Sequence, residues 1–222
     1  KRLRIVFPEG TDERVVRAAA RLKFEGLVEP IILGVPEDVH TLLTDFGFSN
    51  PGITVINPNN YANFDTMRQE FITLRKGKVD ESQADEILRD VNYFGVMLVQ
   101  LGLAEGMVSG AIHSTADTVR PALQIIKTKP GVKRTSGVFL MVKDQHKFVF
   151  GDCAINIEPD AETLAEIAIQ SAETAKTFGI DPKVAMLSYS TKGSGSGPRV
   201  DKVVEATRIA QELRPDLLID GE

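Results

Sequence analysis

Three loops of this chain combine small and hydroxyl residues with a helical pattern directly after them. They are FPEGTDERVV (residues 7–16), VSGAIHSTADTVRP (108–121) and LSYSTKGSGSGPRVDK (187–202). In a parallel α/β sheet such loops lie beyond the carboxyl ends of the strands, where the N–H groups of helix N-termini point at ligands. The chemistry that suits this arrangement is the binding of an anion, above all a phosphate.

Two of the loops add an arginine close to the predicted start of the helix. Arg14 and Arg120 fall in the first predicted turn, where a positive charge opposes the helix dipole. These positions therefore need another reason, and the planar guanidinium binds phosphate through two parallel hydrogen bonds. The residues predicted to cap the two helices are Thr11 or Asp12, and Ser114, Thr115 or Asp117. Each loop alone is explained as an ordinary helix start, but three together favour a polyanion site.

The third loop leaves two interpretations open. Ser190, Thr191 and Lys192 are followed by glycines at 193, 195 and 197. This pattern matches neither GxxxxGK[ST] nor GxGxxG, so neither nucleotide-binding fingerprint applies. A loop rich in glycine and serine either cradles a phosphate with its backbone or is simply mobile, and the sequence favours neither.

Other reactive side chains carry weaker signals. We predict that His113 forms hydrogen bonds within its loop and that Cys153 is a small buried residue at a strand end. His40 and His146 are predicted on the surface, and Arg75, in LRKGK, at a solvated helix terminus. No group of His, Cys, Asp and Glu has metal-ligand spacing, so we expect no metal site.

Composition narrows the class of partner. The 222 residues carry a net charge of −5, with 42% hydrophobic and 26% charged residues and a single cysteine. A negative net charge argues against a nucleic-acid partner. The apolar runs are too short to cross a membrane, and one cysteine fits a reducing cytoplasm. An anionic small molecule remains compatible if the cations are concentrated in one place.

The elements that must position these loops alternate between strand and helix. Strands are predicted at residues 4–7, 30–33, 53–56, 106–109, 136–142, 147–152, 183–190 and 216–220. Helices are predicted at residues 11–24, 39–46, 63–74, 81–101 with a break near 91, 117–127, 161–178 and 200–213. Such alternation predicts an α/β fold with a parallel sheet covered by helices, and the close pair 136–142 and 147–152 predicts an antiparallel or mixed element.

A change of pattern at Pro130–Gly131 predicts two α/β domains, residues 1–130 and 131–222. The last predicted strand enters a βα turn with no covering helix after it. Because parallel strands are buried on both faces, either the chain is a fragment or its final strand lies at the edge of the sheet. We favour the fragment and expect the second domain to be partial.

Long motifs of this chain closely resemble those of the phosphate acetyltransferases (phosphotransacetylases). They are FPEGTDERVVRAAARL, SGAIHSTADTVRPALQIIKTKPG, DCAINIEPDAETLAEIA and VAMLSYSTKGS, and the resemblance extends over all 222 residues. It implies reversible acetyl transfer between acetyl-CoA and inorganic phosphate, which gives acetyl phosphate and CoA. It also implies two α/β domains with an interdomain cleft, similar to the isocitrate/isopropylmalate dehydrogenases, usually in a homodimer. Coenzyme A would be a substrate, and no bound cofactor is expected.

The resemblance also assigns site residues. It places Arg14, Arg75 and Arg120 in an arginine-lined cleft, although Arg75 by itself suggested only a solvated helix end. The loop Ser190, Thr191, Lys192, Gly193 and Ser194 resembles the CoA-side loop of the family. The substrate-binding residues would include His113, Ser114 and Thr115, and backbone N–H and hydroxyl groups around Ser114 and Thr115 could stabilise an oxyanion.

One family feature is missing from these residues. The family's general base is an aspartate in a C-terminal segment with an NDLSRG-type motif, and no such motif occurs here. We therefore expect the base beyond residue 222, with little turnover by this chain alone.

Three other functions were compared with acetyl transfer to phosphate. A phosphate acyltransferase for a longer chain such as butyryl differs only in the volume of the acyl pocket. An acetyl-CoA-sensing module, like the transacetylase-like domain of some malic enzymes, would be preceded by a malic-enzyme region. An NAD(P)-linked decarboxylating dehydrogenase would need carboxylates around a divalent metal, which these motifs do not supply.

Overall fold

The computed structural model describes residues 2–48 and 52–222. The chain divides into two compact units, residues 1–127 (unit 1) and residues 128–222 (unit 2). The predicted boundary at Pro130–Gly131 falls in the connection that follows the last helix of unit 1. The expected cleft between two domains stays a prediction, and each unit is described by itself.

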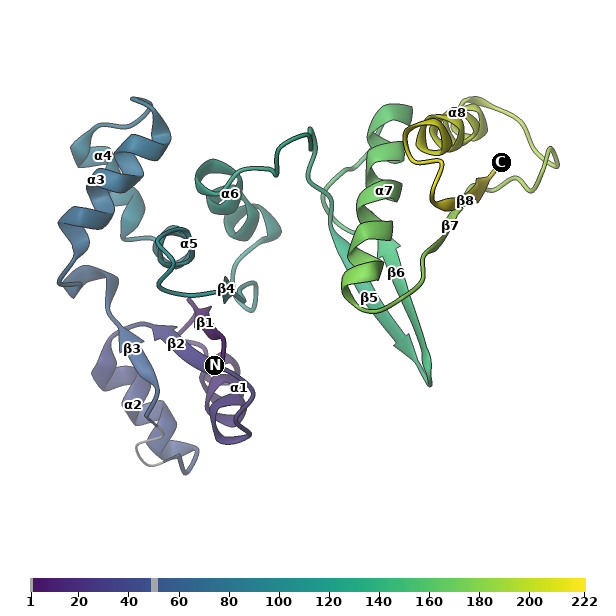
Figure 1. The fold of residues 1–222 in the computed structure, drawn as a ribbon. Helices are drawn as coiled ribbons and strands as arrows, with labels where there is room; N and C mark the ends of the chain where they lie inside the picture. Colours follow the sequence, from purple (N-terminus) through teal and green to yellow (C-terminus); the bar gives the residue numbers. More distant parts are fainter. Residues whose placement is uncertain (1, 49–51) are drawn as a thin grey trace. The chain divides into compact units, whose positions relative to one another are not determined.

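Unit 1 is built on a parallel sheet with strand order β3-β2-β1-β4 (Figure 1). Its strands are β1 (Arg4–Phe7), β2 (Glu29–Leu33), β3 (Thr54–Ile56) and β4 (Gly106–Met107). The central strand β1 places Val6 opposite Ile31 of β2 on one side and Met107 of β4 on the other. A parallel sheet is thus confirmed, with its strands a residue or two shorter than predicted in places.

Helices cover both faces of this sheet. They are α1 (Glu13–Phe24), α2 (Pro36–Asp45), α3 (Phe64–Arg75), α4 (Glu81–Leu88), α5 (Val91–Gln100) and α6 (Thr115–Ile125), with a short 3₁₀ turn at Pro58–Asn60. Phe7 and Ile32 pack with α1 and α2, whereas Val6, Ile31 and Leu33 pack with α3 to α6. Because successive strand residues point to opposite faces, β1 and β2 contribute to both cores. Figure 1 shows helices on both sides of the sheet.

Aspartates cap helices of unit 1, among them α1 and α5. The Asp12 carboxylate accepts hydrogen bonds from the N–H groups of Arg14 and Val15, so α1 begins at residue 13. Asp90 caps α5 in the same way and divides the predicted helix 81–101 into α4 and α5. In the turn before α1, a Cβ at Gly10 would lie 2.2 Å from the carbonyl oxygen of Leu33, so only glycine fits this close approach.

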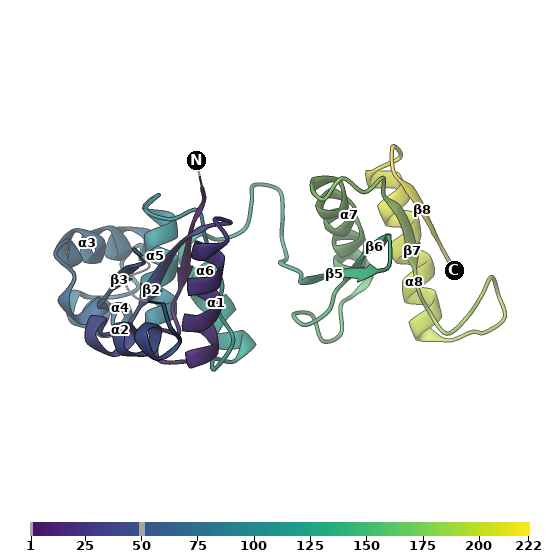
Figure 2. The same cartoon turned by 90° about the horizontal axis from the view of Figure 1, so that it is seen from below.

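Unit 2 contains two small sheets and two helices that pack side by side, α7 (Ala161–Thr177) and α8 (Pro198–Leu213) (Figure 2). β5 (Val138–Lys143) and β6 (His146–Gly151) form an antiparallel hairpin, which confirms the predicted antiparallel pair. β7 (Lys183–Met186) and β8 (Leu218–Gly221) pair in parallel and share an apolar core with α7 and α8. β7 ends at Met186, four residues before the end of the predicted strand 183–190. The residues that follow Met186 are therefore part of the third loop.

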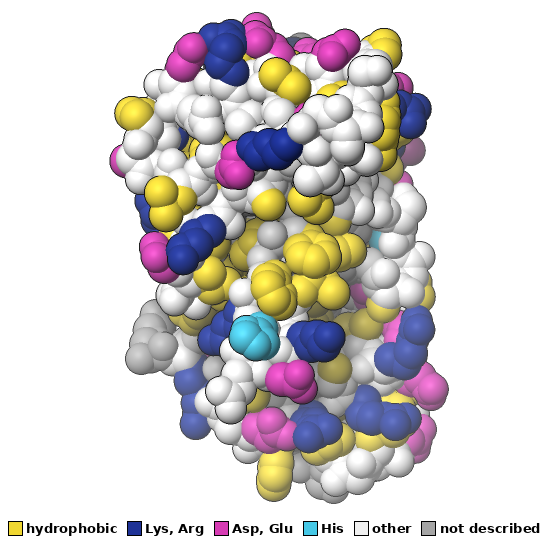
Figure 3. Space-filling view, turned by 90° about the vertical axis from the view of Figure 1, so that its right-hand side faces the viewer, with side chains coloured by type: hydrophobic (Ala, Val, Ile, Leu, Met, Phe, Trp, Pro, Cys, Tyr) yellow, Lys and Arg dark blue, Asp and Glu magenta, His cyan; other side chains and the backbone are white. Residues whose placement is uncertain are grey.

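Two further observations concern the hydrophobic residues of the chain. Exposed hydrophobic side chains are frequent on the hairpin, among them Phe139, Phe148 and Phe150, and Figure 3 shows such side chains gathered in the middle of one face. Among the described residues, no helix has the length and hydropathy needed to span a membrane.

Candidate functional site

The first two loops meet at Arg14. Its guanidinium forms an ion pair with Asp12 at 2.7 Å and donates a hydrogen bond of 3.2 Å to the carbonyl oxygen of Ala111. Hydrogen bonding and the charge of Arg14 lower the pKa of Asp12 to about 2. Arg14 is nevertheless two-thirds exposed. The turn after β1 and the loop before α6 are therefore joined by an arginine that still faces solvent.

A buried carboxylate, Glu9, organises the second loop. Its side chain is 1% exposed. Its two oxygens accept hydrogen bonds from the backbone N–H groups of Gly110 (3.2 Å), Ala111 (2.9 Å), Ile112 (2.8 Å) and His113 (3.1 Å). The ring Nδ1 of His113 lies 2.8 Å from the same carboxylate. The hydrogen-bonding role expected for His113 is therefore observed, and its partner is a residue that the sequence had not singled out.

The loop hydrogen bonds change the acidity of Glu9. Burial alone would raise the pKa of this carboxyl, but hydrogen bonds from Ile112, the His113 ring, Ala111 and Gly110 together outweigh it and lower the pKa to about 2. Glu9 is therefore ionised at neutral pH, and its charge is balanced by peptide dipoles that converge on it.

This acidity predicts a pH-dependent contribution to stability. A carboxyl with a lowered pKa stabilises the fold fully above its ordinary value of 4.5, and that stabilisation is lost as pH falls toward about 2. We expect Glu9→Gln to lose up to ~3 kcal/mol of unfolding free energy at pH 7. The deficit relative to the unsubstituted protein should shrink between pH 4.5 and 2, measured by urea unfolding. A deficit that is constant over this range would contradict the assignment.

Helix α6 begins directly after this loop. Ser114 is its cap, because the Ser114 hydroxyl accepts from the N–H of Asp117 and donates to the Asp117 carboxylate at 2.6 Å. Within the described chain, the N–H groups of Thr115 and Ala116 have no hydrogen-bond partner, so the positive end of α6 is open.

The start of α6 also corrects the position predicted for Arg120. The helix begins at Thr115, two residues earlier than predicted, so Arg120 lies in its second turn and not in its first. The helix dipole therefore opposes this arginine less than we expected. Arg120 is exposed and forms no hydrogen bond or ion pair with any described residue, which leaves its guanidinium available to a ligand.

Arg75, the last residue of α3, contacts the far end of α6. Its guanidinium donates to the carbonyl oxygen of Gln124 at 3.4 Å, and its Nε is buried without a hydrogen-bond partner among the described residues. Arg75 does lie at a helix terminus, as predicted, but its side chain is half-buried, so the expected solvation is wrong. The Tyr93 hydroxyl donates to the Gln124 side chain at 3.0 Å, and burial raises the pKa of Tyr93 while the charges of Arg120 and Arg75 lower it. Of the three candidate arginines, Arg120 lies on α6, Arg75 contacts its last turn, and Arg14 contacts the loop that precedes it.

The third loop is held by a carboxylate in the same way as the second. Glu222 accepts hydrogen bonds from the Ser190 hydroxyl (2.5 Å) and from the N–H groups of Lys192 and Gly193. The N–H groups of Thr191 and Gly195 are bonded to the hydroxyls of Ser194 and Ser190.

Lys192 is also engaged, since its ammonium contacts Asp220 at 2.8 Å. The backbone of this loop is therefore occupied by its own side chains and does not present an open cradle of N–H groups. Ser190, Thr191, Lys192, Gly193 and Ser194 lie together, but in unit 2, and the three arginines lie in unit 1.

A third carboxylate, Asp152, follows β6. It accepts from the N–H groups of Gly137, Ala154, Ile155 and Asn156, and burial is outweighed by these bonds, so the pKa of Asp152 falls to about 2. Cys153 in this loop is a free thiol and only half-buried, which corrects the expected full burial. His40 and His146 are exposed, as predicted. Across residues 2–48 and 52–222, no cluster of His, Cys, Asp and Glu could hold a metal.

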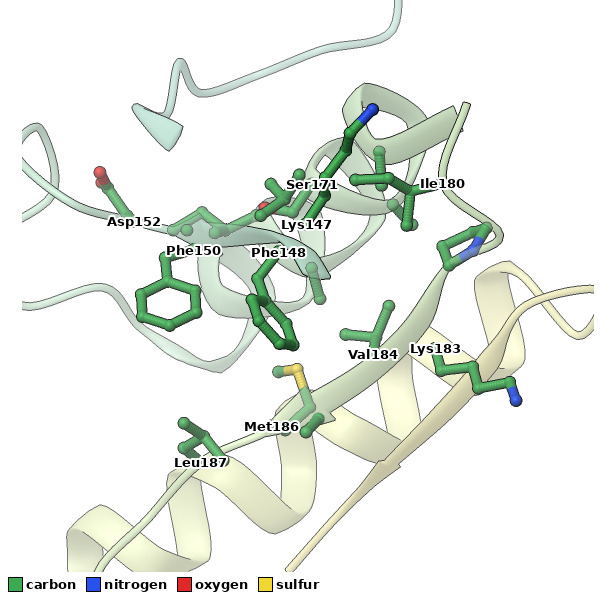
Figure 4. Close-up of a pocket in the computed structure, with 18 of the residues that line it drawn as sticks. Lys147, Phe148, Phe150, Asp152, Ser171, Ile180, Lys183, Val184, Met186 and Leu187 are labelled. Atoms are coloured by element: carbon green, nitrogen blue, oxygen red, sulfur yellow. The ribbon is translucent and has the colours of Figure 1, made fainter. Parts of the chain in front are cut away.

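A cavity of about 650 Å³ lies within unit 2, between β6, α7 and β7 (Figure 4). Phe148, Val184 and Met186 line it, and Lys147 and Lys183 at its edge direct their amino groups away from it in Figure 4. Its only buried polar atom without a partner among the described residues is the Ser171 hydroxyl. This cavity offers no arrangement of charged groups for an anion, so the candidate site is the arginine-bearing side of α6.

Glu9 is the functional candidate that sequence reasoning missed. The sequence FPEG shows that Glu9 follows a predicted strand and precedes a glycine. It does not show the loop that binds Glu9, which lies about a hundred residues further along the chain. A glutamate in an otherwise apolar strand-end segment could have indicated a buried charge, since such residues are buried only when paired.

Comparison with known proteins identifies a family and similar sequences. The family model "Phosphate acetyl/butaryl transferase" matches residues 1–222. The curated phosphate acetyltransferase of Bacillus subtilis (strain 168) is 52% identical over 222 residues, which cover 100% of this chain and 69% of that protein.

Solved structures similar to this chain also include phosphotransacetylases. A phosphotransacetylase from Streptococcus pyogenes is 69% identical with a TM-score of 0.93, and the match covers 100% of this chain and 68% of that one. A branched-chain phosphotransacylase from Enterococcus faecalis V583 is 17% identical, with a TM-score of 0.62 over 97% of this chain and 65% of that one, and supports the fold alone.

Proposed function

This chain belongs to the phosphate acetyl/butaryl transferase family, and from that premise we propose that it transfers an acetyl group reversibly between coenzyme A and inorganic phosphate. Coenzyme A is a substrate in this proposal, and no cofactor takes part. The observation that carries the proposal is that Arg120 lies on α6, Arg75 contacts the end of α6 at Gln124 and Arg14 contacts the loop before α6 at Ala111. An acyl phosphate needs cations, and the chain as a whole is negative.

We assign the phosphate to the α6 side of unit 1. The free guanidinium of Arg120 would bind the phosphoryl oxygens, and Arg14 and Arg75 would add positive charge from either end of the helix. The unpaired N–H groups of Thr115 and Ala116, with the hydroxyl of Thr115, would stabilise negative charge that develops on the acetyl oxygen. His113 and Ser114 hold the loop and the cap that present these donors.

The chemical step is direct transfer. The thiolate of CoA attacks the carbonyl carbon of acetyl phosphate, a C–S bond forms, and the C–O bond to phosphate breaks as phosphate leaves with its electron pair. The thiol proton passes to a general base. The family resemblance assigns that base to an aspartate of an NDLSRG-type motif, which these 222 residues do not contain.

We propose that the loop from Ser190 to Ser194 contributes to the CoA side. Its backbone N–H groups are already bonded to Glu222 and to the loop's own hydroxyls, so contacts to CoA would come from the side chains of Thr191 and Lys192. Lys192 would exchange its contact with Asp220 for an anionic group of CoA. We also propose a cytoplasmic homodimer, on the single cysteine and the family resemblance.

The experiment is an assay of CoA release from acetyl-CoA, with and without inorganic phosphate, in the intact protein that contains these residues. We expect release that depends on phosphate and acetyl phosphate that forms in equal amount. Binding of acetyl-CoA without turnover would contradict the proposal and favour an acetyl-CoA-sensing module.

The family description leaves a second acyl group to compare. Since it names both acetyl and butaryl transfer, butyryl-CoA should be tested beside acetyl-CoA. A higher kcat/KM for acetyl-CoA would support the acetyl assignment, because one or two methylenes change pocket binding by ~1–3 kcal/mol each.

A further inference from the structure

Glu9 does more than fill a space beneath a loop. A carboxylate whose side chain is 1% exposed is costly to bury, and no lysine or arginine among residues 2–48 and 52–222 forms an ion pair with it. Its compensation comes from the N–H groups of residues 110–113 and from the His113 ring. Those N–H groups face inward to Glu9 and cannot themselves bind a ligand, so the loop is shaped around the carboxylate.

The loop that Glu9 shapes contacts Arg14 and leads directly into α6, the two parts of the proposed phosphate site. The carbonyl oxygen of Ala111 receives the Arg14 guanidinium, and Ser114, which follows the loop directly, caps α6 and so leads to Arg120. The carbonyl oxygen of Glu9 also accepts from the N–H of Asp12, the partner of Arg14. One residue therefore fixes both the turn before α1 and the loop before α6.

A neutral side chain could not do this. A glutamine of the same size would turn its amide NH₂ toward some of the N–H groups of residues 110–113, which would leave buried donors without acceptors. The loop would have to rearrange to satisfy them, and Arg14 and the start of α6 would move with it.

We propose that Glu9 is a positioning residue for phosphate binding: its buried carboxylate places the loop Gly110–His113 and, through it, Arg14 and the N-terminal end of α6 against the phosphate. The proposal rests on the proposed function, because it assigns the phosphate to the α6 side. It goes beyond that function by making affinity for phosphate depend on a residue that does not touch it.

The test compares KM values in the intact enzyme for Glu9→Gln and Asp152→Asn. Asp152 is the matched control, since it is a carboxylate that accepts N–H groups from a loop of unit 2 in the same way. We expect Glu9→Gln to raise KM for phosphate by roughly ten- to a hundred-fold, the range for loss of a group that orients ligand-binding residues. KM for acetyl-CoA should stay within about two-fold, and Asp152→Asn should leave KM for phosphate within about two-fold.

A third variant, Glu9→Asp, guards against failure to fold, because it keeps the charge and withdraws it by one methylene. It should melt closer to the unsubstituted protein and still raise KM for phosphate. The proposal is overturned if folded Glu9 variants keep the KM for phosphate, or if KM for phosphate and for acetyl-CoA rise equally.

Arg120→Ala separates this proposal from the function on which it rests. If Arg120→Ala raises KM for phosphate and the Glu9 variants do not, the role of Glu9 is wrong and the phosphate site stands. If neither residue affects phosphate, the phosphate does not bind at α6, and the proposed function of this site fails with the inference.

Discussion

Arg120→Ala should lower kcat/KM for phosphate by about 10²- to 10³-fold, or ~3–4 kcal/mol of transition-state stabilisation. Phosphate, acetyl phosphate and the transition state for acetyl transfer all carry negative charge, and Arg120 is the candidate arginine whose guanidinium no described residue occupies. The substitution therefore removes no hydrogen bond or ion pair between described residues, only the weaker effect of its charge on Tyr93 and Asp117. We therefore expect the free energy of unfolding to change by no more than about 0.5 kcal/mol.

The other two arginines would give less direct answers. Arg14 is paired with Asp12, so its removal would leave the cap of α1 with an unbalanced charge. Arg75 has a buried Nε and contacts Gln124, so its removal would disturb the packing of α3 on α6. A loss of activity in either variant would mix binding with positioning.

The measurement is steady-state kinetics in both directions, with the unfolding midpoint recorded for each variant. Arg208→Ala is the control, because Arg208 is an arginine of α8 that is paired with Glu205 and Glu212 on the surface of unit 2. It removes the same charge and should leave kcat/KM within about two-fold. Equal losses in both variants would show that net charge, and not the position of Arg120, determines the rate.

Local signals in the sequence predicted much of the fold. The 3.6-residue periodicity and the acidic caps located the helices, including the break between α4 and α5 at Asp90, and alternating apolar runs located the parallel strands. Boundaries were less certain. α6 begins at Thr115 because the Ser114 hydroxyl, and not the Asp117 carboxylate, caps it, and both residue types were plausible there.

Contacts around the candidate site followed from the residues alone only where their signals were local. Asp12 and Arg14 are neighbours in sequence, and their contact follows from the cap. Arg75 meets Gln124 across 49 positions and Glu9 meets Ala111 across 102, and nothing within either segment specifies the other. The family resemblance found Arg75, but not Glu9, because a buried charge is understood only when its partners are known.

The third loop shows a different limit. Alternating glycines and hydroxyls were compatible with a phosphate cradle and with a mobile loop. In the structure, backbone N–H groups of this loop are already hydrogen-bonded and do not form an open phosphate cradle. Glu222 and the loop's own serines occupy the N–H groups of residues 191–193 and 195. Whether a glycine-rich loop presents its backbone to a ligand depends on which carboxylate lies beneath it, and that is a tertiary fact.

Among these variants, Phe94→Ala should lose the most unfolding free energy, about 3–5 kcal/mol, which is the range for replacing a fully buried phenylalanine by alanine. Phe94 is 0% exposed, and its ring packs edge-on against Tyr61 with 5.2 Å between the ring centroids. It belongs to the core cluster that also holds Val6 of β1 and Ile125 of α6. The substitution therefore leaves a cavity beneath the strand and the helix that support the candidate site. Since domains are typically stable by only 5–15 kcal/mol, much of the stability of unit 1 is at risk.

Urea unfolding, followed by circular dichroism, measures this loss, and Phe24→Ala is its control. Phe24 is the last residue of α1 and is 84% exposed, so the same chemical change there should alter the unfolding free energy by less than about 0.5 kcal/mol. Activity adds a second reading, because a cavity beneath β1 and α6 should weaken phosphate binding even at low temperature, where the variant is folded. Equal effects of the two substitutions on the unfolding midpoint would mean that the core around Phe94 does not support this side of the sheet.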